Sequence, residues 1–283
     1  MKPLQGCSIL VTRPQQQAQP FCQRLEQAGA KVFHFPTIHI ESTELDEQTL
    51  QTLNQLEQQD IILFTSVNAV HFCLPWLQSF INKNAKPPNT SSLNLPFQIG
   101  AIGKKTAQHL RDNHLNVPIL PSNNFNSESL LALPAMQSIA HKNILIVKGK
   151  GGRSLLRDSL QARGANVKCV SLYSRQCPVL DKQMLNDIQS QKIDIITLTS
   201  VESSENLFSL LKDQSIKWLA GSTLLLGSQR IYRALSDSNN RDNIRDDIRN
   251  HIRERKNPFW VAKNPTDDAM FAALLEWKKQ HLE

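Results

Sequence analysis

Ile9-Leu10-Val11-Thr12-Arg13 and Ile144-Leu145-Ile146-Val147-Lys148 decide the fold, because the second stretch repeats the first about 135 positions later. Two further pairs of segments share this offset within one residue: Gly29–Val32 with Gly164–Val167, and Asp60–Val67 with Asp194–Val201. Chance apolar runs would not keep one spacing over three matches. The sequence therefore predicts a duplicated unit, and two similar lobes form a cleft in which a ligand can bind.

Short apolar runs rich in β-branched residues alternate with helix-length segments, which is typical of βαβ units around a parallel sheet. We predict strands over residues 8–12, 31–35, 61–65, 98–102, 117–120, 144–148, 167–172, 194–199, 222–227 and 259–262. Apolar residues at helical spacing predict helices over residues 15–28, 154–163 and 203–211. Gly29 and Gly164 stand where the first helix of each copy has to end. The repeat alone places the boundary between the copies near residue 141.

The chain carries 32 Lys and Arg against 25 Asp and Glu, a formal net charge of +7 that is spread along its 283 residues. This excess indicates either an ordinary cationic face or an anionic ligand, which is a small polyacid or a nucleic acid. We favour the polyacid, because the sequence has no nucleic-acid-binding signature and only two Tyr for stacking on bases.

The cysteine spacing and the hydropathy of the sequence indicate the cellular compartment of the protein. The five cysteines form no CxxC pair, which is typical of free thiols in a reducing compartment: Cys7, Cys22, Cys73, Cys169 and Cys177. No stretch approaches the roughly 18 apolar residues of a membrane span, and residues 1–5 show no hydrophobic leader. We predict a cytoplasmic protein without membrane contact.

Two segments stand outside the α/β pattern. Residues 82–95 are polar and contain Pro87-Pro88, which predicts an exposed loop. Residues 236–257 place isoleucines four apart among charged residues, which predicts a surface helix with a thin apolar stripe. A basic helix for a membrane or a nucleic acid is the alternative for the second segment.

Small polar and basic residues follow the predicted strands at matched places in both copies. In parallel α/β sheets, ligands bind beyond the carboxyl ends of the strands, where helix N-termini point free N–H groups. The matched segments are Thr65–Asn68 with Thr199–Ser200, Gly103–Thr106 with Gly227–Arg230, and Arg13–Pro14 with Lys148–Arg153. Each alone is typical of a helix N-cap, but the matched set, with its Lys and Arg residues, predicts an anion-binding site.

The familiar catalytic motifs are absent from the sequence. Lys148–Arg153 is rich in glycine, but it contains neither GxxxxGK[ST] nor GxGxxG, so a nucleotide is an alternative without a motif to support it. HExxH, GxSxG and a Cys–His pair at a family spacing are also missing. An enzyme of this kind would steer a reactive substrate by holding its geometry.

At these residues the chain resembles the uroporphyrinogen-III synthase family. Phrases of that family occur in order: Val11–Pro14, Phe64–Val70, Ala101–Ala107, Leu172–Arg175, Thr199–Glu202 and Ser228–Ile231. The resemblance runs from about residue 7 to 235 and resumes at Trp260–Ala262. Residues 236–257 are longer and more charged than the segment that the family usually carries there.

The resemblance implies a cofactor-free lyase of tetrapyrrole synthesis. Such enzymes dehydrate and close hydroxymethylbilane while inverting its last pyrrole ring, through an azafulvene and a spiro-pyrrolenine, to give uroporphyrinogen III. The eight carboxylates of this substrate accord with the cationic balance. The substrate also closes spontaneously to the uninverted isomer, so the enzyme has to hold it against that path. A transient contact with the preceding deaminase belongs to this expectation, whereas nucleic acid and membrane do not.

The resemblance also implies roles for individual residues. Tyr173 matches the tyrosine that is proposed in this family to assist departure of the hydroxyl group, and its alternative role is structural. Strand-end positions that line the family's cleft are matched by Ser66, Thr106, Ser200 and Ser228. Our own candidates for contacts with carboxylates are Arg13, Lys148, Arg153 and Arg230. The expected substrate-binding set is completed by Thr65, Asn68, Gly103, Lys104, Gly149 and Thr199.

Family members pair the N-terminal β-α-β segment with the C-terminal third of the chain, which replaces the tandem boundary near residue 141. We therefore expect two flavodoxin-like lobes with parallel sheets, residues 1–38 with 174–283 and residues 39–173. A two-strand hinge is expected near residues 36–42 and 168–176. The alternatives in function are a bilobal polyanion-binding protein or inactive paralogue, and a nucleotide-dependent enzyme.

Overall fold

The computed structural model, which describes residues 2–84, 95–211, 221–236 and 259–281, divides the chain into two compact units. Unit 1 comprises Met1–His39 and Gln176–Glu283, and unit 2 comprises Ile40–Arg175. The chain therefore passes between the units twice. The loop predicted at residues 82–95 and the helix predicted at residues 236–257 lie almost entirely outside the described residues.

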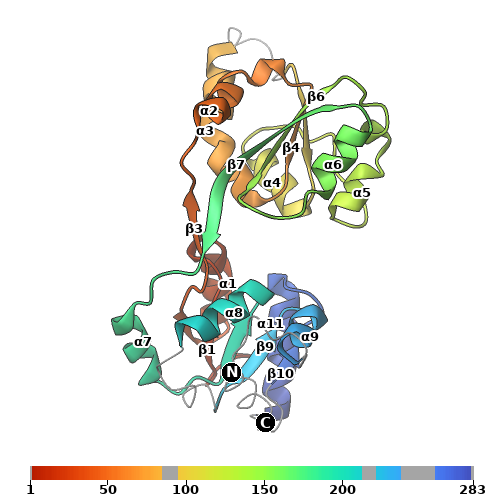
Figure 1. The fold of residues 1–283 in the computed structure, drawn as a ribbon. Coiled ribbons are helices and arrows are strands. Elements are labelled where there is room, and N and C mark those ends of the chain that lie inside the picture. The colour runs from red at the N-terminus through yellow and green to blue at the C-terminus, as the bar shows by residue number, and fades with distance from the viewer. Residues whose placement is uncertain (1, 85–94, 212–220, 237–258, 282–283) are drawn as a thin grey trace. The chain divides into compact units, whose positions relative to one another are not determined.

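Unit 1 is built on a five-stranded parallel sheet (Figure 1). Its strands lie in the spatial order β10 (Phe259–Val261), β9 (Thr223–Leu226), β8 (Ile195–Leu198), β1 (Ser8–Val11) and β2 (Lys31–His34). Counted from β2, and numbering the strands by their order in this unit, the sheet reads 2-1-3-4-5. This is the flavodoxin order, as the family resemblance implies.

Helices cover both faces of the unit 1 sheet. One core cluster joins Ile9, Val11 and Ile195 to α1 (Gln15–Gln27) and α11 (Asp267–His281). The cluster on the other face joins Leu10, Ile196 and Leu198 to α7 (Lys182–Gln189), α8 (Val201–Leu210) and α9 (Gln229–Ser236). The strands are apolar on both faces because both faces are buried.

Unit 2 carries a second five-stranded sheet, in the order β3 (His39–Ser42), β7 (Asn166–Gln176), β6 (Asn143–Gly149), β4 (Ile61–Phe64) and β5 (Gln98–Ala101). The four strands β4 to β7 are parallel. One face packs against α2 (Glu47–Asn54), η1 (Leu56–Gln58), α3 (Val67–Asn84) and α4 (Lys104–Asp112). The other packs against α5 (Ser127–Leu131), η2 (Pro134–Met136) and α6 (Leu155–Ala162), of which Figure 1 labels α5 and α6.

The duplication predicted from the sequence appears as a shared strand order. The offset relates β1 to β6, β2 to β7 and β4 to β8, and β5 and β9 take equivalent places in the two sheets, so β2-β1-β8-β9 is repeated as β7-β6-β4-β5. Two equivalent aspartates mark the copies. Asp194 Oδ2 accepts the N–H of Ser8 at 2.9 Å, and Asp60 Oδ2 accepts the N–H of Asn143 at 2.7 Å. Each carboxylate therefore ties its own strand to its neighbour in the sheet.

One predicted strand is wrong. Residues 117–120 form only an isolated bridge, between Ile119 and Gly100, at the place that β10 takes in unit 1. Pro118 and Pro121 flank this bridge, and proline has no N–H to donate to a longer ladder. The other nine predicted strands are present, and β3 is an addition to them.

The glycines predicted to end the first helix of each copy do so. Gly29 follows α1 with φ +94°, and Gly164 follows α6 with φ +82°. Both lie in the left-handed region, where a side chain is strained.

Candidate functional site

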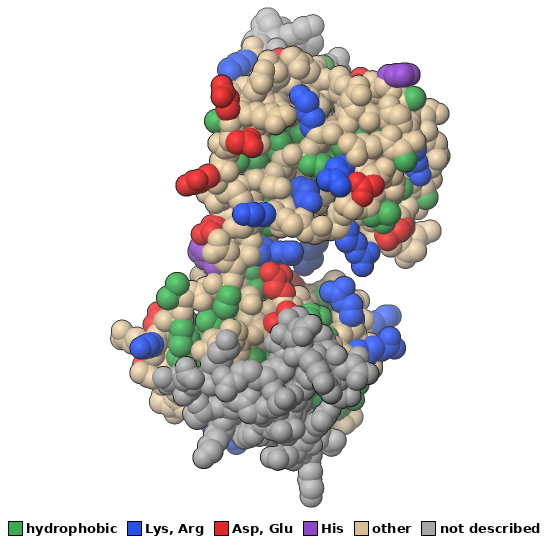
Figure 2. All heavy atoms as spheres, in the orientation of Figure 1, with side chains coloured by type: hydrophobic (Ala, Val, Ile, Leu, Met, Phe, Trp, Pro, Cys, Tyr) green, Lys and Arg blue, Asp and Glu red, His purple; other side chains and the backbone are tan. Residues whose placement is uncertain are grey.

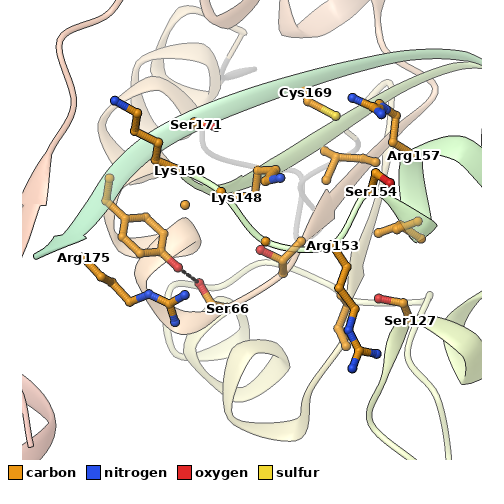
Figure 3. A pocket seen from close by; sticks show the side chains of 18 residues that line it. Ser66, Ser127, Lys148, Lys150, Arg153, Ser154, Arg157, Cys169, Ser171 and Arg175 are labelled. Carbon is orange, nitrogen blue, oxygen red and sulfur yellow. Dashed lines mark hydrogen bonds between the residues drawn. The ribbon is translucent and has the colours of Figure 1, made fainter. Parts of the chain in front are cut away.

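The carboxyl ends of β4 and β6 form the switch point of unit 2, because the chain leaves these neighbouring strands toward opposite edges of the sheet. A pocket of about 570 Å³ lies at this point (Figure 3). Its polar lining comes from the end of β6, from the residues that follow β4 and β6, from β7, from α6 and from the start of α5. These residues are Thr65, Ser66, Ser127, Lys148–Ser154, Arg157, Cys169, Ser171, Tyr173 and Arg175.

Tyr173 presents a phenol to this pocket from β7. Its side chain is largely buried, with 5% of the residue exposed. The ring stacks on Phe72 of α3, with the ring centres 5.7 Å apart and an interplanar angle of 14°. The hydroxyl lies 2.9 Å from Ser66 Oγ, the contact drawn as a dashed line in Figure 3. The ring is thus fixed on one side and the phenol group is held at the pocket.

A bulge between β6 and β7 sets the position of the tyrosine. Lys148 pairs with Ser171, but the next residue, Gly149, pairs with Tyr173, so Leu172 is an extra residue in β7. Leu172 and Tyr173 accordingly pack in the same core cluster, although successive residues of a regular strand point to opposite faces.

Gly149 makes room for the phenol ring. A Cβ at this residue would lie 2.6 Å from Tyr173 Cζ and 2.8 Å from Cε2, which is closer than carbon atoms approach in proteins. A glycine is therefore required here for as long as the ring keeps its place. Its role in unit 2 is to admit Tyr173 to the pocket, which the sequence could not show.

The Tyr173 hydroxyl lies at the N-terminus of α3. Ser66 precedes this helix, and its Oγ accepts the N–H of Ala69 at 3.0 Å while it contacts the phenol. The unpaired N–H groups and the dipole of a helix N-terminus stabilise negative charge. The phenol is therefore held beside these N–H groups, at the pocket, by its contact with Ser66.

Five basic side chains line the pocket: Lys148, Lys150, Arg153, Arg157 and Arg175. Two of them form ion pairs at the surface, Arg157 with Asp158 at 2.8 Å and Arg153 with Glu128 at 3.6 Å. Figure 3 shows Arg175 on the same side of the pocket as Ser66. Several lysine and arginine side chains also gather on the visible face of unit 2 in Figure 2. The pocket is suited to a ligand with several negative charges.

Cys169 also lines the pocket, but its environment disfavours a nucleophilic role. Cys169 is an exposed residue, but partial burial of its thiol raises the pKa above the ordinary value, whereas the positive charges of Lys148 and Arg157 act in the opposite direction. The raised pKa keeps the thiol protonated at neutral pH, and the thiolate is the nucleophilic form.

The structure brings together six of the residues expected to bind or transform a substrate: Thr65, Ser66, Lys148, Gly149, Arg153 and Tyr173. Four others belong to unit 2 but do not line this pocket: Asn68, Gly103, Lys104 and Thr106. Asn68 and Thr106 are buried, and the Lys104 ammonium lies 5.0 Å above the Phe125 ring.

Sequence reasoning did not name as site residues seven polar residues that line the pocket: Ser127, Lys150, Ser154, Arg157, Cys169, Ser171 and Arg175. Beyond the matched segments that contain Lys150 and Arg175, the only available signal was for Ser127, which follows an Asn suited to a helix N-cap.

Unit 1 holds the remaining candidates at its own strand ends. Ser200 caps α8, with its Oγ accepting the N–H of Ser203 at 3.0 Å. Thr199 is half-buried beside it. Ser228 is half-buried and Arg230 is exposed at the start of α9. These residues belong to the sheet of unit 1 and do not contribute to the pocket of unit 2.

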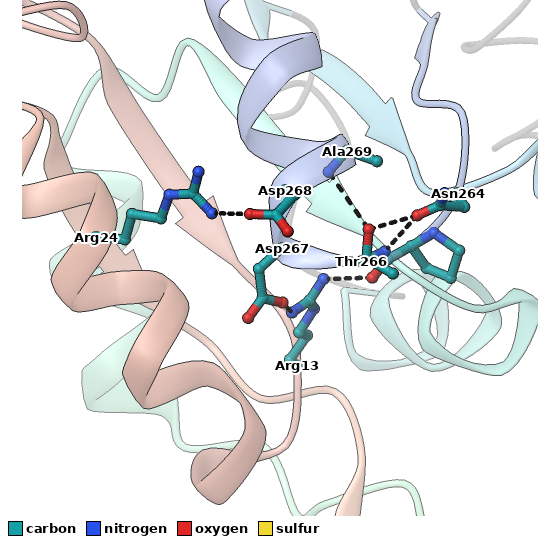
Figure 4. Close-up of polar contacts among 8 residues, drawn as sticks. Arg13, Arg24, Asn264, Thr266, Asp267, Asp268 and Ala269 are labelled. Carbon is teal, nitrogen blue, oxygen red and sulfur yellow. Dashed lines mark hydrogen bonds and ion pairs between the residues drawn. The ribbon is translucent and has the colours of Figure 1, made fainter. Parts of the chain in front are cut away.

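Arg13 is already occupied by contacts within unit 1. Only 6% of the residue is exposed, and its Nη1 forms an ion pair with Asp267 Oδ1 at the start of α11 (Figure 4). Its Nη2 donates to the Pro265 carbonyl at 2.7 Å. A contact between Arg13 and a ligand carboxylate would require this arrangement to open.

In the part of the chain that the structure describes, no helix is long and apolar enough to cross a membrane. Residues 19–245 match the family described as uroporphyrinogen-III synthase HemD. The uroporphyrinogen-III synthase of Escherichia coli (strain K12) is 32% identical over 79% of this chain and 88% of that protein. The enzyme of that name from Proteus mirabilis is 34% identical over 59% of this chain and 80% of its own length.

Solved structures show the same fold at lower identity. The uroporphyrinogen-III synthetase of Helicobacter pylori 26695 aligns with a TM-score of 0.56 and 16% identity, over 96% of this chain and 99% of that one. A mutant uroporphyrinogen III synthase from the extremely thermophilic bacterium Thermus thermophilus aligns with a TM-score of 0.54 and 16% identity, over 98% and 100% of the two chains.

Proposed function

The chain belongs to the uroporphyrinogen-III synthase family, and we propose that it converts hydroxymethylbilane to uroporphyrinogen III at the pocket of unit 2. The reaction closes the linear tetrapyrrole, releases water and inverts the last pyrrole ring. One observation carries the proposal: the Tyr173 phenol, 2.9 Å from Ser66 Oγ, faces a pocket lined by five basic side chains. The placement joins a proton donor to a site for a polycarboxylate.

Tyr173 supplies the proton for the first step in this proposal. When the C–O bond of the hydroxymethyl group breaks, the electron pair leaves with oxygen, and the phenol proton completes a water molecule. The electrons of the pyrrole nitrogen form the azafulvene, which gives up the N–H proton and so balances the one taken from Tyr173. The N-terminus of α3 and the Ser66 hydroxyl stabilise the intermediate phenolate.

The basic side chains have a separate task, which is to hold the carboxylates. Spontaneous closure gives the uninverted isomer, so the enzyme gains by restricting how the last ring approaches its target. Charged groups that hold several carboxylates at once restrict the chain in this way. The sequence adds three expectations that stay with the proposal: the domain boundaries after residues 38 and 173, a cytoplasmic location, and a transient contact with the deaminase.

Isomer analysis tests the proposal. Porphobilinogen and its deaminase supply hydroxymethylbilane, this protein is added, and the oxidised products are separated into uroporphyrins I and III. We expect the product to change from isomer I to isomer III. Isomer I alone, from protein shown to be folded, would contradict the proposal, and tight binding of uroporphyrin by that protein would favour the polyanion-binding alternative.

A further inference from the structure

Each unit has a basic residue at the end of an equivalent strand, but the surroundings of the two residues differ. Arg13 follows β1 in unit 1, and Lys148 stands 135 residues later in β6 of unit 2. Arg13 is buried and neutralised by Asp267. Lys148 lines the pocket, and no carboxylate among the described residues lies within ion-pair distance of it. Unit 2 thus lacks the negative charge that unit 1 supplies to itself.

The position equivalent to Asp267 is Ser127, because α5 takes in unit 2 the place of α11. The core cluster of unit 1 that contains α11 also contains α1, and the cluster of unit 2 that contains α5 also contains α6. Since α1 and α6 are copies of each other, α11 and α5 pack on equivalent faces of the two sheets.

The start of each helix fixes the register of this match. Thr266 precedes α11, and its Oγ1 accepts the N–H of Ala269 at 3.4 Å. Asn126 precedes α5, and its Oδ1 accepts the N–H of Ser129 at 2.8 Å. Each capping residue thus bonds three positions ahead. The first helical residue is Asp267 in one unit and Ser127 in the other.

The second helical residue keeps its charge in both units. Asp268 forms an ion pair with Arg24 at 2.6 Å, and Glu128 forms one with Arg153 at 3.6 Å. The difference in charge between the two helix starts is therefore confined to the first position. That position faces the strand-end cation in unit 1 and lines the pocket in unit 2.

We propose that Asp267 marks in unit 1 the place that a ligand carboxylate takes in unit 2, so that Lys148 and Ser127 form a carboxylate subsite. Lys148 supplies the charge and the Ser127 hydroxyl supplies a hydrogen-bond donor. The ligand of this subsite is one carboxylate of the linear tetrapyrrole, and that identification rests on the proposed function. The repeat thus assigns one point of attachment within a pocket that has room for several.

A carboxylate built into unit 2 tests this subsite directly. In Ser127→Asp the pocket receives the charge that Asp267 provides in unit 1, and a ligand carboxylate is excluded. The probe is uroporphyrin I, an octacarboxylate that undergoes no reaction here, and its affinity is measured by fluorescence titration. We expect about tenfold weaker binding, the usual worth of one charge-assisted contact.

Ser129→Asp is the matched control, because it adds the same charge two residues later in α5 at a position that does not line the pocket. We expect it to bind uroporphyrin I within about twofold of the unmodified protein. Lys148→Met is the second variant and removes the cation instead. It should also weaken binding of uroporphyrin I about tenfold. In the Lys148→Met background, Ser127→Asp should lower the affinity little further, because both changes remove the same contact.

Equal affinities for the Ser127→Asp and Ser129→Asp variants would overturn the subsite, as would an unaltered affinity in Lys148→Met. Failure of the proposed function gives a different pattern. If the protein makes no uroporphyrin III, but Ser127→Asp selectively weakens its binding of uroporphyrin I, the proposed function is wrong and the proposed subsite stands. If the protein makes uroporphyrin III, but the two aspartate variants bind uroporphyrin I equally well, the proposed function stands and the proposed subsite is wrong.

Discussion

Unit 1 and unit 2 share one strand order but place their polar groups differently at the switch point. In unit 1, Thr12 Oγ1 lies 3.0 Å from Ser203 Oγ, which lies 2.8 Å from Thr37 Oγ1, and all three residues are buried. In unit 2, the equivalent residues are apolar and belong to the core: Val147, Ala69 and Leu172.

The phenol of unit 2 occupies a position that in unit 1 belongs to a buried apolar side chain. Tyr173 is equivalent in sequence to Ile38, which is buried. The buried hydroxyl groups and Arg13 of unit 1 have partners within that unit, whereas Tyr173 of unit 2 packs on apolar residues beside a pocket lined by basic side chains. The fold thus provides two equivalent places for a site, and a pocket lined by five basic side chains lies at the one in unit 2.

The sharpest test of this contrast removes the phenol. Tyr173→Phe keeps the ring that stacks on Phe72, so the fold should persist. We expect turnover to fall about 100-fold, the usual effect of losing a proton donor, with little change in KM. Steady-state rates and a thermal melt check both statements. Unchanged turnover would remove Tyr173 from the mechanism.

The second test breaks the closed arrangement of unit 1. Asp267→Asn leaves Arg13 buried without its counter-ion, and we expect a loss of about 2 kcal/mol in the free energy of unfolding. That figure is reduced from the full cost of a buried pair because the Asp267 side chain is 27% exposed.

Asp268→Asn is the control for this loss. Its pair with Arg24 is exposed, so we expect less than about 0.5 kcal/mol. Denaturant titrations of both variants give the comparison. Equal losses would show that the Arg13 contact does not hold unit 1 together.

The third test concerns the space beside the phenol. Gly149→Ala forces the Tyr173 ring to move, and we expect turnover about tenfold lower. In the Tyr173→Phe background the same change should lower stability, since the ring carbons still collide, but should not reduce turnover further. Gly221→Ala adds the same methyl group where no atom lies within 4 Å and serves as the control. If the two changes instead lowered turnover additively, Gly149 would affect turnover independently of the Tyr173 phenol.

The fourth test compares equivalent caps. Ser66 and Ser200 each accept an N–H three residues ahead, so replacing either by Ala should cost about 1 kcal/mol of stability. Only Ser66 also contacts a phenol, and we expect Ser66→Ala to lower turnover about threefold more than Ser200→Ala. Equal turnover in the two variants would argue against a role for the Ser66 contact.

The smallest expected effect is on thiol chemistry. Because burial raises the pKa of Cys169, its alkylation should be slow at neutral pH and should accelerate at a higher pH than that of an ordinary thiol. Saturating uroporphyrin I should slow it about twofold more by covering the pocket, and should leave Cys177, which lies in unit 1, unaffected. Mass spectrometry of both peptides measures the two rates. Equal protection would place the ligand elsewhere.

Whereas the strand order follows from the family resemblance, the sequence alone predicts the repeat and most strands, since both follow from apolar periodicity and a nearly constant offset. It fails at residues 117–120, where β-branched residues suggest a strand but Pro118 and Pro121 prevent a ladder. Strand ends are also visible in a sequence, which is how Ser66 and Lys148 could be named, whereas Tyr173 is named through the family resemblance.

What the sequence cannot give depends on contacts between distant segments. The ion pair of Arg13 with Asp267 joins residues 254 positions apart, and neither neighbourhood indicates the other. Gly149 resembles part of a glycine-rich anion loop, and only the bulge beside Leu172 shows that it makes room for a ring. Ser127 matters through the carboxylate that it replaces, and that is evident only when the two units are compared.

One measurement tests most directly whether the chemistry belongs to unit 2: the isomer composition made from hydroxymethylbilane by Tyr173→Phe and by Asp267→Asn, at equal concentrations of folded protein. We expect Tyr173→Phe to shift the product toward the spontaneous isomer I, whereas Asp267→Asn should continue to give isomer III. Isomer III from Tyr173→Phe together with isomer I from Asp267→Asn would contradict this expectation and would move the site to unit 1.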